Sequence, residues 1–339
     1  MTAGTGRWLR LTLGLLFASL FVWLVLRRLD FAAVGRAIAA IPWPVLALAV
    51  LSLALGYGVR IIRWWLMLRA SDPKLKLSAC VRPLLVSVAV NNVIPFRAGD
   101  ALRVVGFRRQ LAAAPVRVFA TLVVERVLDL TVLLAVFLVG VGGVKAGAIP
   151  HAYVRGCVVI ACLGLLAWVV ALLFARHLQA LLLRVCEHRT LAARDWTRPA
   201  QKYVTQFLTA LEVLRTPKLS LGLLALSALA WSCEGGVFAL VAYGLKFSGD
   251  AIAPWFAAAT GTLATLIPSS PGYVGTFDFF TMQALIAYGA SLAVAGAFAL
   301  VVHTVLWLPL TIAGFINFLL PNPAGSEAPA ALVQRDDPQ

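Results

Sequence analysis

The chain has 339 residues, of which 61% are hydrophobic and only 13% are charged. Soluble domains contain about 45–50% apolar and about 25% charged residues, so this composition excludes a soluble globular fold. The formal net charge is +15, but the cations lie beside apolar runs and form no separate basic domain, which argues against a nucleic-acid partner and favours contact with an anionic lipid surface. The five cysteines are scattered without metal-ligand spacing, so neither a disulfide framework nor a metal or other cofactor is expected.

Several apolar runs approach or exceed the ~17–25 residues that cross a bilayer. Lipid offers no hydrogen-bond partners to a bare backbone, so these runs are predicted to be helices. The fold class expected is all-α, a polytopic membrane protein with about six transmembrane helices. The predicted spans are residues 8–26, 43–58, 118–140, 154–175, 219–245 and 292–320. The first run ends without a small-x-small cleavage site and is interpreted as a retained anchor.

The distribution of Lys and Arg predicts the topology. Cations concentrate in residues 69–117 and 176–218, which the positive-inside rule places in the cytoplasm. The stretch 140–155 between two spans holds few cations and is expected outside. Both termini are then cytoplasmic, and residues 176–218 form a cytoplasmic connection. Residues 321–339 are polar and rich in Pro and Ala, which is typical of a disordered tail.

Two shorter apolar segments are interrupted by proline and glycine. Residues 84–96 are too few to cross the bilayer, and a length near 13 fits a re-entrant or buried segment. Residues 251–267 lead into a second break, which is followed by a short apolar helix at 277–288. We expect re-entrant helical hairpins in the regions 76–110 and 251–290, or eight spans in total if both hairpins cross the membrane fully.

The two broken segments share one order of features. In each, an apolar helix is followed by Ile-Pro and a glycine-containing polar turn, with Pro95 and Gly99 in the first and Pro268 and Gly272 in the second. Breaks at corresponding places in two halves are typical of transporters with inverted repeats. The match is a few residues long, so it predicts a weak inverted repeat within one transmembrane domain, residues 1–320.

The first break carries a cluster of charges. Arg97, Asp100 and Arg103 are spaced by three, which stacks them on one face if a helix resumes after the break. Two cations around one carboxylate leave positive charge that suits a phosphate, to which Arg offers a fork of donors. The alternative is a surface turn in which Asp100 is an ordinary helix cap. The candidate substrate-binding residues here are Asn91, Asn92, Pro95, Arg97, Gly99, Asp100 and Arg103.

Two further arginines, Arg60 and Arg63, follow the second predicted span beside Trp64 and Trp65. They either snorkel to the membrane surface within an aromatic belt or bind a lipid head group. Both are retained as candidate substrate-binding residues.

Charged residues also occur within the apolar helices. Glu125, Arg126 and Asp129 lie inside the span 118–140, where each charge costs roughly 2.5–3.5 kcal/mol on insertion scales. Partners for the two carboxylates are expected among four arginines, which are Arg60, Arg63, Arg97 and Arg103. These residues form either a structural set of salt bridges or a proton relay, since a buried carboxylate readily shifts its pKa.

Two more titratable groups lie in later helices. Glu234, beside Gly235, is either paired with an arginine or coupled to protons. His303, near Trp307, is either a packing histidine or a titrating group.

The second break offers backbone N–H groups in place of cations. Prolines stop the helix, glycines permit the turn, and freed N–H groups at a helix N-terminus can hold an anion. The alternative is an ordinary loop. The candidates are Ser269, Ser270, Pro271, Gly272 and Gly275 for binding and Asp278 for charge balance.

Motifs of catalysis are absent from the sequence. It contains no Walker A lysine motif, no GxSxG elbow and no HExxH, so ATP-driven transport by this chain and enzymatic activity are not expected. An enzyme using an intramembrane carboxylate as general base is a poorer alternative.

Taken together, these motifs resemble one known family. They are Arg63-Trp64, Asn92 to Asp100 followed by Arg103, Glu125-Arg126 with Asp129, and Pro268 to Gly275. The pattern, over roughly residues 8–320, resembles the flippase-like integral membrane family, which includes the transmembrane region of lysylphosphatidylglycerol synthase, stand-alone proteins and a branch linked to hopanoid biosynthesis. The resemblance implies re-entrant helices that enter from opposite faces around a lipid-sized cavity. Better-known members carry a soluble synthase domain, and since the sequence stops at Gln339 without one, this chain is not expected to make the lipid.

The function expected is a lipid flippase or lipid-trafficking protein of a bacterial inner membrane. Arg63, Arg97 and Arg103 would attract the head group, and residues 268–275 would form the opposite gate. The lipid is an anionic phospholipid, a polyprenyl-phosphate carrier or a hopanoid. The rival is a membrane scaffold for lipid- or hopanoid-modifying enzymes. Besides lipid, a second copy of the chain or an enzyme of lipid synthesis is the expected partner.

Overall fold

The computed structural model describes residues 30–70, 72–94, 97–144, 217–267 and 270–320, together with the isolated positions 155, 158, 159, 162 and 166. Within these residues the regular elements are helices without a strand, which confirms the all-α class. Several predictions fall on other parts of the chain. The spans 8–26 and 154–175, the connection 176–218 and the tail 321–339 lie wholly or almost wholly outside the described residues.

Three of the described helices are long and apolar enough to cross a membrane: α3 (Trp43–Arg69), α12 (Pro217–Gly244) and α15 (Leu292–Leu319). A fourth long helix, α7 (Pro115–Val141), has similar length but carries three charges near its middle. These helices correspond to four predicted spans. α3 extends eleven residues past the predicted end at Gly58, because the charges that follow are paired within the protein.

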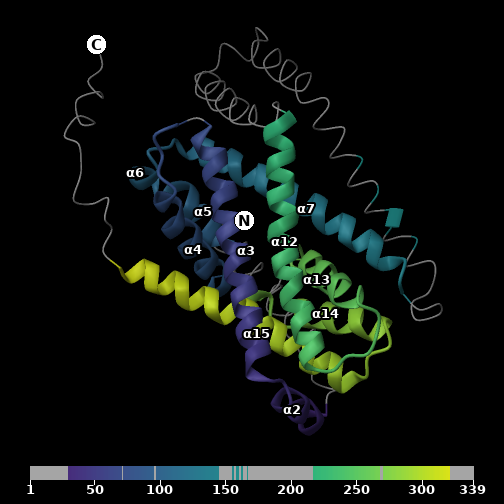
Figure 1. Cartoon of the computed structure of the whole chain (residues 1–339). Coiled ribbons are helices and arrows are strands. Elements are labelled where there is room, and N and C mark those ends of the chain that lie inside the picture. Colours follow the sequence, from purple (N-terminus) through teal and green to yellow (C-terminus); the bar gives the residue numbers. More distant parts are fainter. Residues whose placement is uncertain are drawn as a thin grey trace, which may run out of the picture.

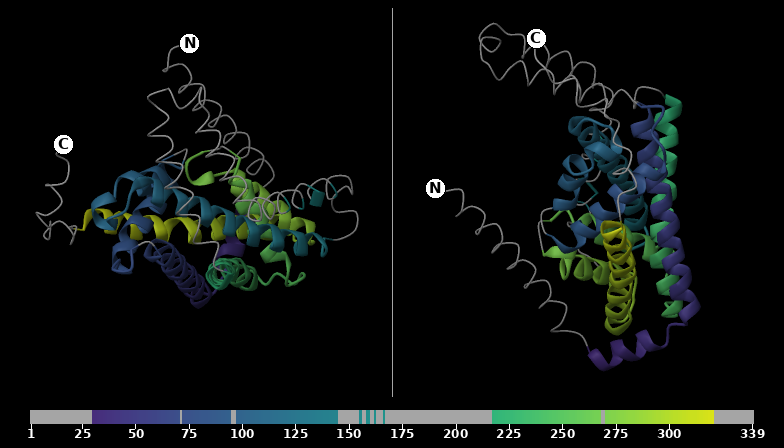
Figure 2. Two further views of the ribbon diagram at one scale, coloured as in Figure 1. Left: turned by 90° about the horizontal axis from the view of Figure 1, so that it is seen from above. Right: turned by 90° about the vertical axis from the view of Figure 1, so that its left-hand side faces the viewer.

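The long helices α3 and α12 run side by side along one face of the molecule, and the two broken segments lie behind them, to the two sides in Figure 1. The Ser52 hydroxyl on α3 donates a hydrogen bond to the Cys233 carbonyl on α12, at 2.6 Å. Figure 2 shows α3 and α12 as a layer on one side of α7 and α15. α15 packs closely on α4 because Gly314 lacks the Cβ that would overlap Ala89.

The first break separates α4 (Ser78–Val93) from α5 (Ala98–Val105), and α6 (Arg108–Leu111) follows. α4 ends where expected, because Ile94 precedes a proline and adopts an extended conformation with φ −106° and ψ 131°. With 16 and 8 residues, α4 and α5 are each shorter than the ~20 residues of a typical membrane-crossing helix.

The second break separates α13 (Ala253–Ala264) from α14 (Thr276–Ala287). A single helical turn, η2 (Pro271–Tyr273), lies between them. These two 12-residue helices pack against each other, as Figure 1 shows in green, and α14 packs on α15. The remaining described helix, α2 (Phe31–Ala39), begins at Asp30, whose carboxylate accepts hydrogen bonds from two N–H groups of its first turn.

Two apolar cores leave a polar layer between them. Along α3, Leu53 belongs to the first core and Trp64 to the second, so Tyr57 and Arg60 fall between the cores. Along α12, Leu223 belongs to the second core and Val237 to the first, with Glu234 in between. Polar side chains from α3 and α12 therefore meet in one layer of the fold, between the two apolar cores.

Candidate functional site

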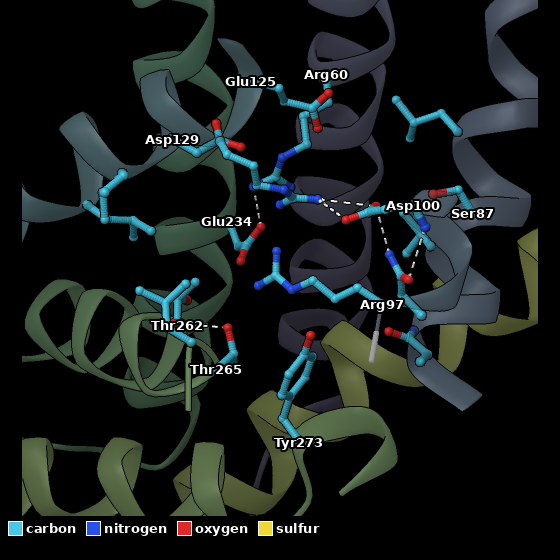
Figure 3. A pocket seen from close by; sticks show the side chains of 18 of the residues that line it. Arg60, Ser87, Arg97, Asp100, Glu125, Asp129, Glu234, Thr262, Thr265 and Tyr273 are labelled. Atoms are coloured by element: carbon cyan, nitrogen blue, oxygen red, sulfur yellow. Dashed lines mark hydrogen bonds and ion pairs between the residues drawn. The ribbon is translucent and has the colours of Figure 1, made fainter. Parts of the chain in front are cut away.

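A cavity of about 380 Å³ occupies this polar layer, which is within the ~300–1,000 Å³ typical of ligand sites. Its walls are supplied by helices α3, α4, α5, α7, α12 and α13 and by the turn η2 (Figure 3). We call it the main cavity. Its charged lining residues are Arg60, Arg97, Asp100, Arg103, Glu125, Arg126, Asp129 and Glu234. The site therefore gathers charges from both the long helices and the first break.

The two carboxylates of α7 are each bonded to an arginine. Asp129 Oδ1 accepts a hydrogen bond from Arg63 Nη1 at 2.5 Å, and the same nitrogen donates to the Ser227 hydroxyl at 2.6 Å. Glu125 Oε2 lies 2.8 Å from Arg103 Nη2, and its Oε1 lies 3.7 Å from Arg63 Nη2. Arg63 is 0% exposed. A paired and hydrogen-bonded set of this kind makes the buried charges of α7 tolerable.

A second ion pair joins α3 and α12. Arg60 Nη2 lies 2.6 Å from Glu234 Oε2. The Arg60 guanidinium carbon lies 4.9 Å from the ring centroids of both Tyr57 and Trp231, which places the cation over two aromatic faces. Arg60 Nη1 is buried and has no hydrogen-bond acceptor among the described residues. One donor of this arginine therefore remains available to a ligand.

Asn91 joins the end of α4 to the start of α5. Its side-chain oxygen accepts hydrogen bonds from the Gly99 and Asp100 N–H groups at 2.8 and 3.3 Å, and its amide donates to Asp100 Oδ1 at 3.0 Å. Asp100 in turn pairs with Arg126 at 3.2 Å, near the surface. A Cβ at Gly99 would overlap the Ser87 carbonyl oxygen, so only glycine lets α5 approach α4 this closely. These contacts fix the backbone directly after the break.

Each break places one residue other than glycine in the left-handed backbone region, and both of these side chains point into the main cavity. Arg97 has φ 54° and Tyr273 has φ 60°, which is uncommon for residues other than glycine. Each stands two residues after a proline, Pro95 in the first case and Pro271 in the second. Figure 3 shows Arg97 extending into the middle of the cavity, with Tyr273 directed toward the same space.

Arg97 differs from the other cavity arginines. Arg60, Arg103 and Arg126 each pair with a carboxylate, whereas Arg97 forms neither an ion pair nor a side-chain hydrogen bond with any described residue. An unpaired guanidinium in a hollow lined by paired charges attracts an anion, and its planar fork fits a phosphate or carboxylate.

A smaller cavity of about 160 Å³, which we call the side cavity, adjoins the main one. The two cavities share part of their lining. The shared residues are Tyr57, Asn92, Glu234, Thr262, Thr265 and Tyr273. Asn92 is held by hydrogen bonds to the Thr311 hydroxyl at 2.9 Å and to the Trp307 carbonyl at 3.4 Å, so α4 and α15 form one wall.

At the far side of the side cavity, His303 Nδ1 lies 2.7 Å from Asp278 Oδ1. The other Asp278 oxygen accepts a hydrogen bond from the Gly275 N–H at 2.8 Å, in front of α14. The N-terminus of α14 is therefore capped by the protein's own carboxylate. Its binding of an external anion, which the sequence predicted, stays a prediction.

The structure brings most of the predicted residues together. Arg60, Arg97, Arg103 and the α7 carboxylates face the main cavity, while Gly272 and His303 face the side cavity. Arg63 is buried behind the main cavity in its ion pairs, and Ser270 donates to the Val274 carbonyl away from both cavities. Pro95 and Ser269 lie outside the described residues.

Sequence reasoning predicted Asn91 and Asn92 but missed the aromatic and threonine side chains of the lining. Tyr57, Tyr273, Thr262, Thr265 and Trp231 face the main cavity. Tyrosine and tryptophan in apolar helices resemble a membrane-interface belt, and threonine is common in transmembrane helices, so neither stands out. The available signal was their position: Tyr57 lies three residues before Arg60, and Trp231 three before Glu234, which places each beside a charge on its helix face.

The fold and its buried charges define a helical membrane protein with a polar internal cavity. Comparison with known proteins is more specific: the lysylphosphatidylglycerol synthase transmembrane region matches residues 11–314, and the chain belongs to this family. The chain is also similar to a protein of Haloferax volcanii named glycosyltransferase AglD, with 29% identity over 287 residues. That match covers 74% of this chain and 45% of the relative, so the chain spans less than half of that protein's length.

Proposed function

We propose that this protein moves a lipid with an anionic head group between the leaflets of a bacterial inner membrane, and that Arg97 binds the anion. The carrying observation is the unpaired Arg97 guanidinium in a cavity where the other lining arginines are paired. Membership of a family named for a lipid synthase supports a lipid ligand. The free Nη1 of Arg60 adds a second donor.

The helix breaks support movement of the ligand across the membrane. Two short helical pairs meet at one cavity, and each contributes a side chain from a strained left-handed residue. Discontinuous helices around a central site are the usual architecture of transporters that alternate access between the two sides. We assign α4–α5 and α13–α14 as re-entrant hairpins that enter from opposite faces, with both termini in the cytoplasm.

The positive charge of Arg97 narrows the class of lipid that we propose as the substrate. An anionic phospholipid or a polyprenyl phosphate supplies the phosphate that Arg97 would bind, whereas a neutral hopanoid does not. The name of the relative, glycosyltransferase, is compatible with a lipid-linked substrate that carries a sugar. We therefore favour a phosphate-containing lipid over the hopanoid alternative.

The test is a leaflet-exchange assay with purified protein in liposomes. Fluorescent phosphatidylglycerol and a fluorescent polyprenyl phosphate are placed in both leaflets, and the inner-leaflet fraction that becomes accessible to an external quencher is followed with time. We expect the wild type to accelerate exchange of at least one of the two lipids. Wild-type protein that accelerates neither lipid over protein-free liposomes would overturn the proposal.

Arg97 variants connect the activity to the cavity. Arg97→Gln removes the charge and is expected to lower the rate by about 10- to 100-fold, the worth of a hydrogen bond to a charged group. Arg97→Lys keeps the charge and should retain more activity. Arg36→Gln, at an exposed position on α2, is the matched control and should transport like the wild type.

The scaffold alternative makes a different prediction. If the charges serve folding alone, Arg97→Gln should change activity only in proportion to the loss of folded protein. Size-exclusion profiles and melting temperatures of the same preparations separate the two cases, because Arg97 has no described ion pair whose loss would unfold the chain.

A further inference from the structure

The side cavity is lined by hydroxyl groups and aromatic rings. Tyr57, Thr262, Thr265 and Tyr273 supply hydroxyls, and Phe277 and Trp307 supply rings. Apolar and aromatic walls with a few placed polar groups are the usual composition of a small-molecule subsite. The side cavity shares the first four of these residues with the main cavity, so a ligand held by Arg97 can extend directly into it.

Three of these hydroxyls form no hydrogen bond with any residue that the structure describes. Within the described residues, the side chains of Tyr57, Thr262 and Tyr273 form none, while the Thr265 hydroxyl donates to the Thr262 carbonyl at 2.7 Å. Each free hydroxyl can donate one hydrogen bond and accept others. The wall is therefore prepared for a partner that both donates and accepts.

The carboxylate that lines the side cavity already has a cationic partner. The acidic lining residue is Glu234, which pairs with Arg60 at 2.6 Å, and Asp278, which does not line the cavity, lies 2.7 Å from Nδ1 of the lining His303. Arg97 adds an uncompensated positive charge to the adjoining main cavity. An ammonium group would find the lining carboxylate of Glu234 already paired and would be repelled by Arg97, whereas a second anion would be repelled by Glu234. An uncharged polar group fits both conditions.

We propose that the side cavity binds an uncharged, polyhydroxylated part of the lipid head group, such as glycerol, a cyclitol or a sugar, attached to the phosphate at Arg97. The inference rests on the proposed function for the position of the phosphate. It adds the substrate class: phosphate diesters whose head group carries hydroxyls and no amine.

The test measures equilibrium binding, so that it is independent of transport. Full-length protein in detergent micelles is titrated with four lipids that share the same acyl chains and differ beyond the phosphate. They are phosphatidylmethanol without a free hydroxyl, phosphatidylglycerol, phosphatidylinositol, and phosphatidylethanolamine with an ammonium group. We expect phosphatidylglycerol, phosphatidylinositol or both to bind about tenfold more tightly than phosphatidylmethanol, and phosphatidylethanolamine to bind no more tightly than it. The two polyol lipids distinguish a glycerol from a ring as the preferred group.

Variants that delete single hydroxyls locate the preference. Tyr273→Phe and Thr262→Val keep the side-chain shape, and each is expected to lower the ratio of polyol lipid to phosphatidylmethanol affinity by about fivefold, the worth of one hydrogen bond. The phosphatidylmethanol affinity should fall by less than the affinity for the polyol lipids. The matched controls are Tyr243→Phe, on the exposed face of α12, and Thr304→Val, whose exposed hydroxyl donates to the Leu300 carbonyl; neither should alter the ratio.

Three results would overturn the inference: equal affinity of the wild type for phosphatidylmethanol and both polyol lipids, tightest binding of phosphatidylethanolamine, or an equal loss for all lipids in Tyr273→Phe. Binding with the expected preference but without leaflet exchange would contradict the transport proposal and leave the subsite standing. Leaflet exchange without a head-group preference would contradict the subsite and leave the transport proposal standing.

Discussion

The two breaks use the same backbone device and different chemistry. Each stops a short helix near a proline and holds one residue other than glycine, Arg97 or Tyr273, in the left-handed region with its side chain in the main cavity. The first break presents a charge and is backed by the buried ion pairs of α7. The second presents a phenol and is backed by Asp278, which caps its own helix.

This difference indicates that the two breaks have separate roles in binding one ligand. The charged break provides affinity for an anion, since a guanidinium without a carboxylate partner is neutralised only by what enters the cavity. The uncharged break provides selectivity, since hydroxyls discriminate by hydrogen bonding and leave the net charge unchanged. The following substitutions test whether the two breaks are as unequal in stability as they are in charge.

Asp129→Ala should have the largest effect. It removes the carboxylate bonded to Arg63, which is fully buried, and leaves that guanidinium with Ser227 and a distant Glu125. Removing one partner of a buried ion pair costs about 3–5 kcal/mol, so we expect a strongly lowered melting temperature in detergent. Asp250→Ala, at an exposed turn, should cost less than about 1 kcal/mol. Equal melting temperatures for the two variants would contradict the assigned role of the network.

Gly99→Ala should have the next largest effect. The added methyl group would overlap the Ser87 carbonyl oxygen on α4, which is backbone and cannot rotate away. Overpacking of this kind costs about 1–3 kcal/mol, and it should also disturb the Asn91 bonds that hold the first break. Gly58→Ala is the matched control, since a Cβ there meets nothing within 4 Å and favours the helix. Thermal unfolding of both variants measures the difference. A stable Gly99→Ala protein would show that α5 can move away from α4 without loss of stability.

The sequence predicted the four long described helices and the positions of both breaks, because apolar length and proline placement are local properties. Glu125 and Asp129 were expected to find partners among four arginines, and two of the four, Arg63 and Arg103, are those partners. Spacing along a helix defines a shared face, but which arginine faces it depends on how the helices cross. For the same reason the sequence left Arg60 without an assigned partner.

The left-handed backbone of Arg97 and Tyr273 was beyond sequence reasoning. Glycine marks such positions when it is present, whereas an arginine or tyrosine there is held by the surrounding contacts against its own preference. In the first break, Asn91 bonds to the backbone directly after Arg97, and in the second the Tyr273 ring packs against the apolar core. These contacts depend on how separate helices pack, which a local pattern does not contain.

Two aspartate substitutions, one at each break, should differ less in their effect on stability. Asp278→Asn keeps the acceptor for the Gly275 N–H but weakens the bond to the partly buried His303, at a cost of about 1 kcal/mol. Asp100→Asn weakens the bridge to Arg126, which is 45% exposed, and should cost less, since surface pairs contribute about 0–1 kcal/mol. Melting temperatures in low and high salt are the measurement, and only the Asp100 bridge should be weakened by salt. Salt sensitivity confined to the Asp278 pair would reverse the comparison.

Arg97→Gly should have the smallest effect on stability and the opposite sign. Glycine adopts the left-handed region without strain, and Arg97 has no described ion pair to lose, so the free energy of unfolding should stay constant or rise by up to about 1 kcal/mol. Binding of an anionic lipid should nevertheless fall at least tenfold. Tyr273→Gly relieves the same strain but removes a ring that packs on the apolar core, so its melting temperature should fall. If Arg97→Gly destabilises the protein as much as Tyr273→Gly does, Arg97 is a structural residue and the unequal roles of the two breaks disappear.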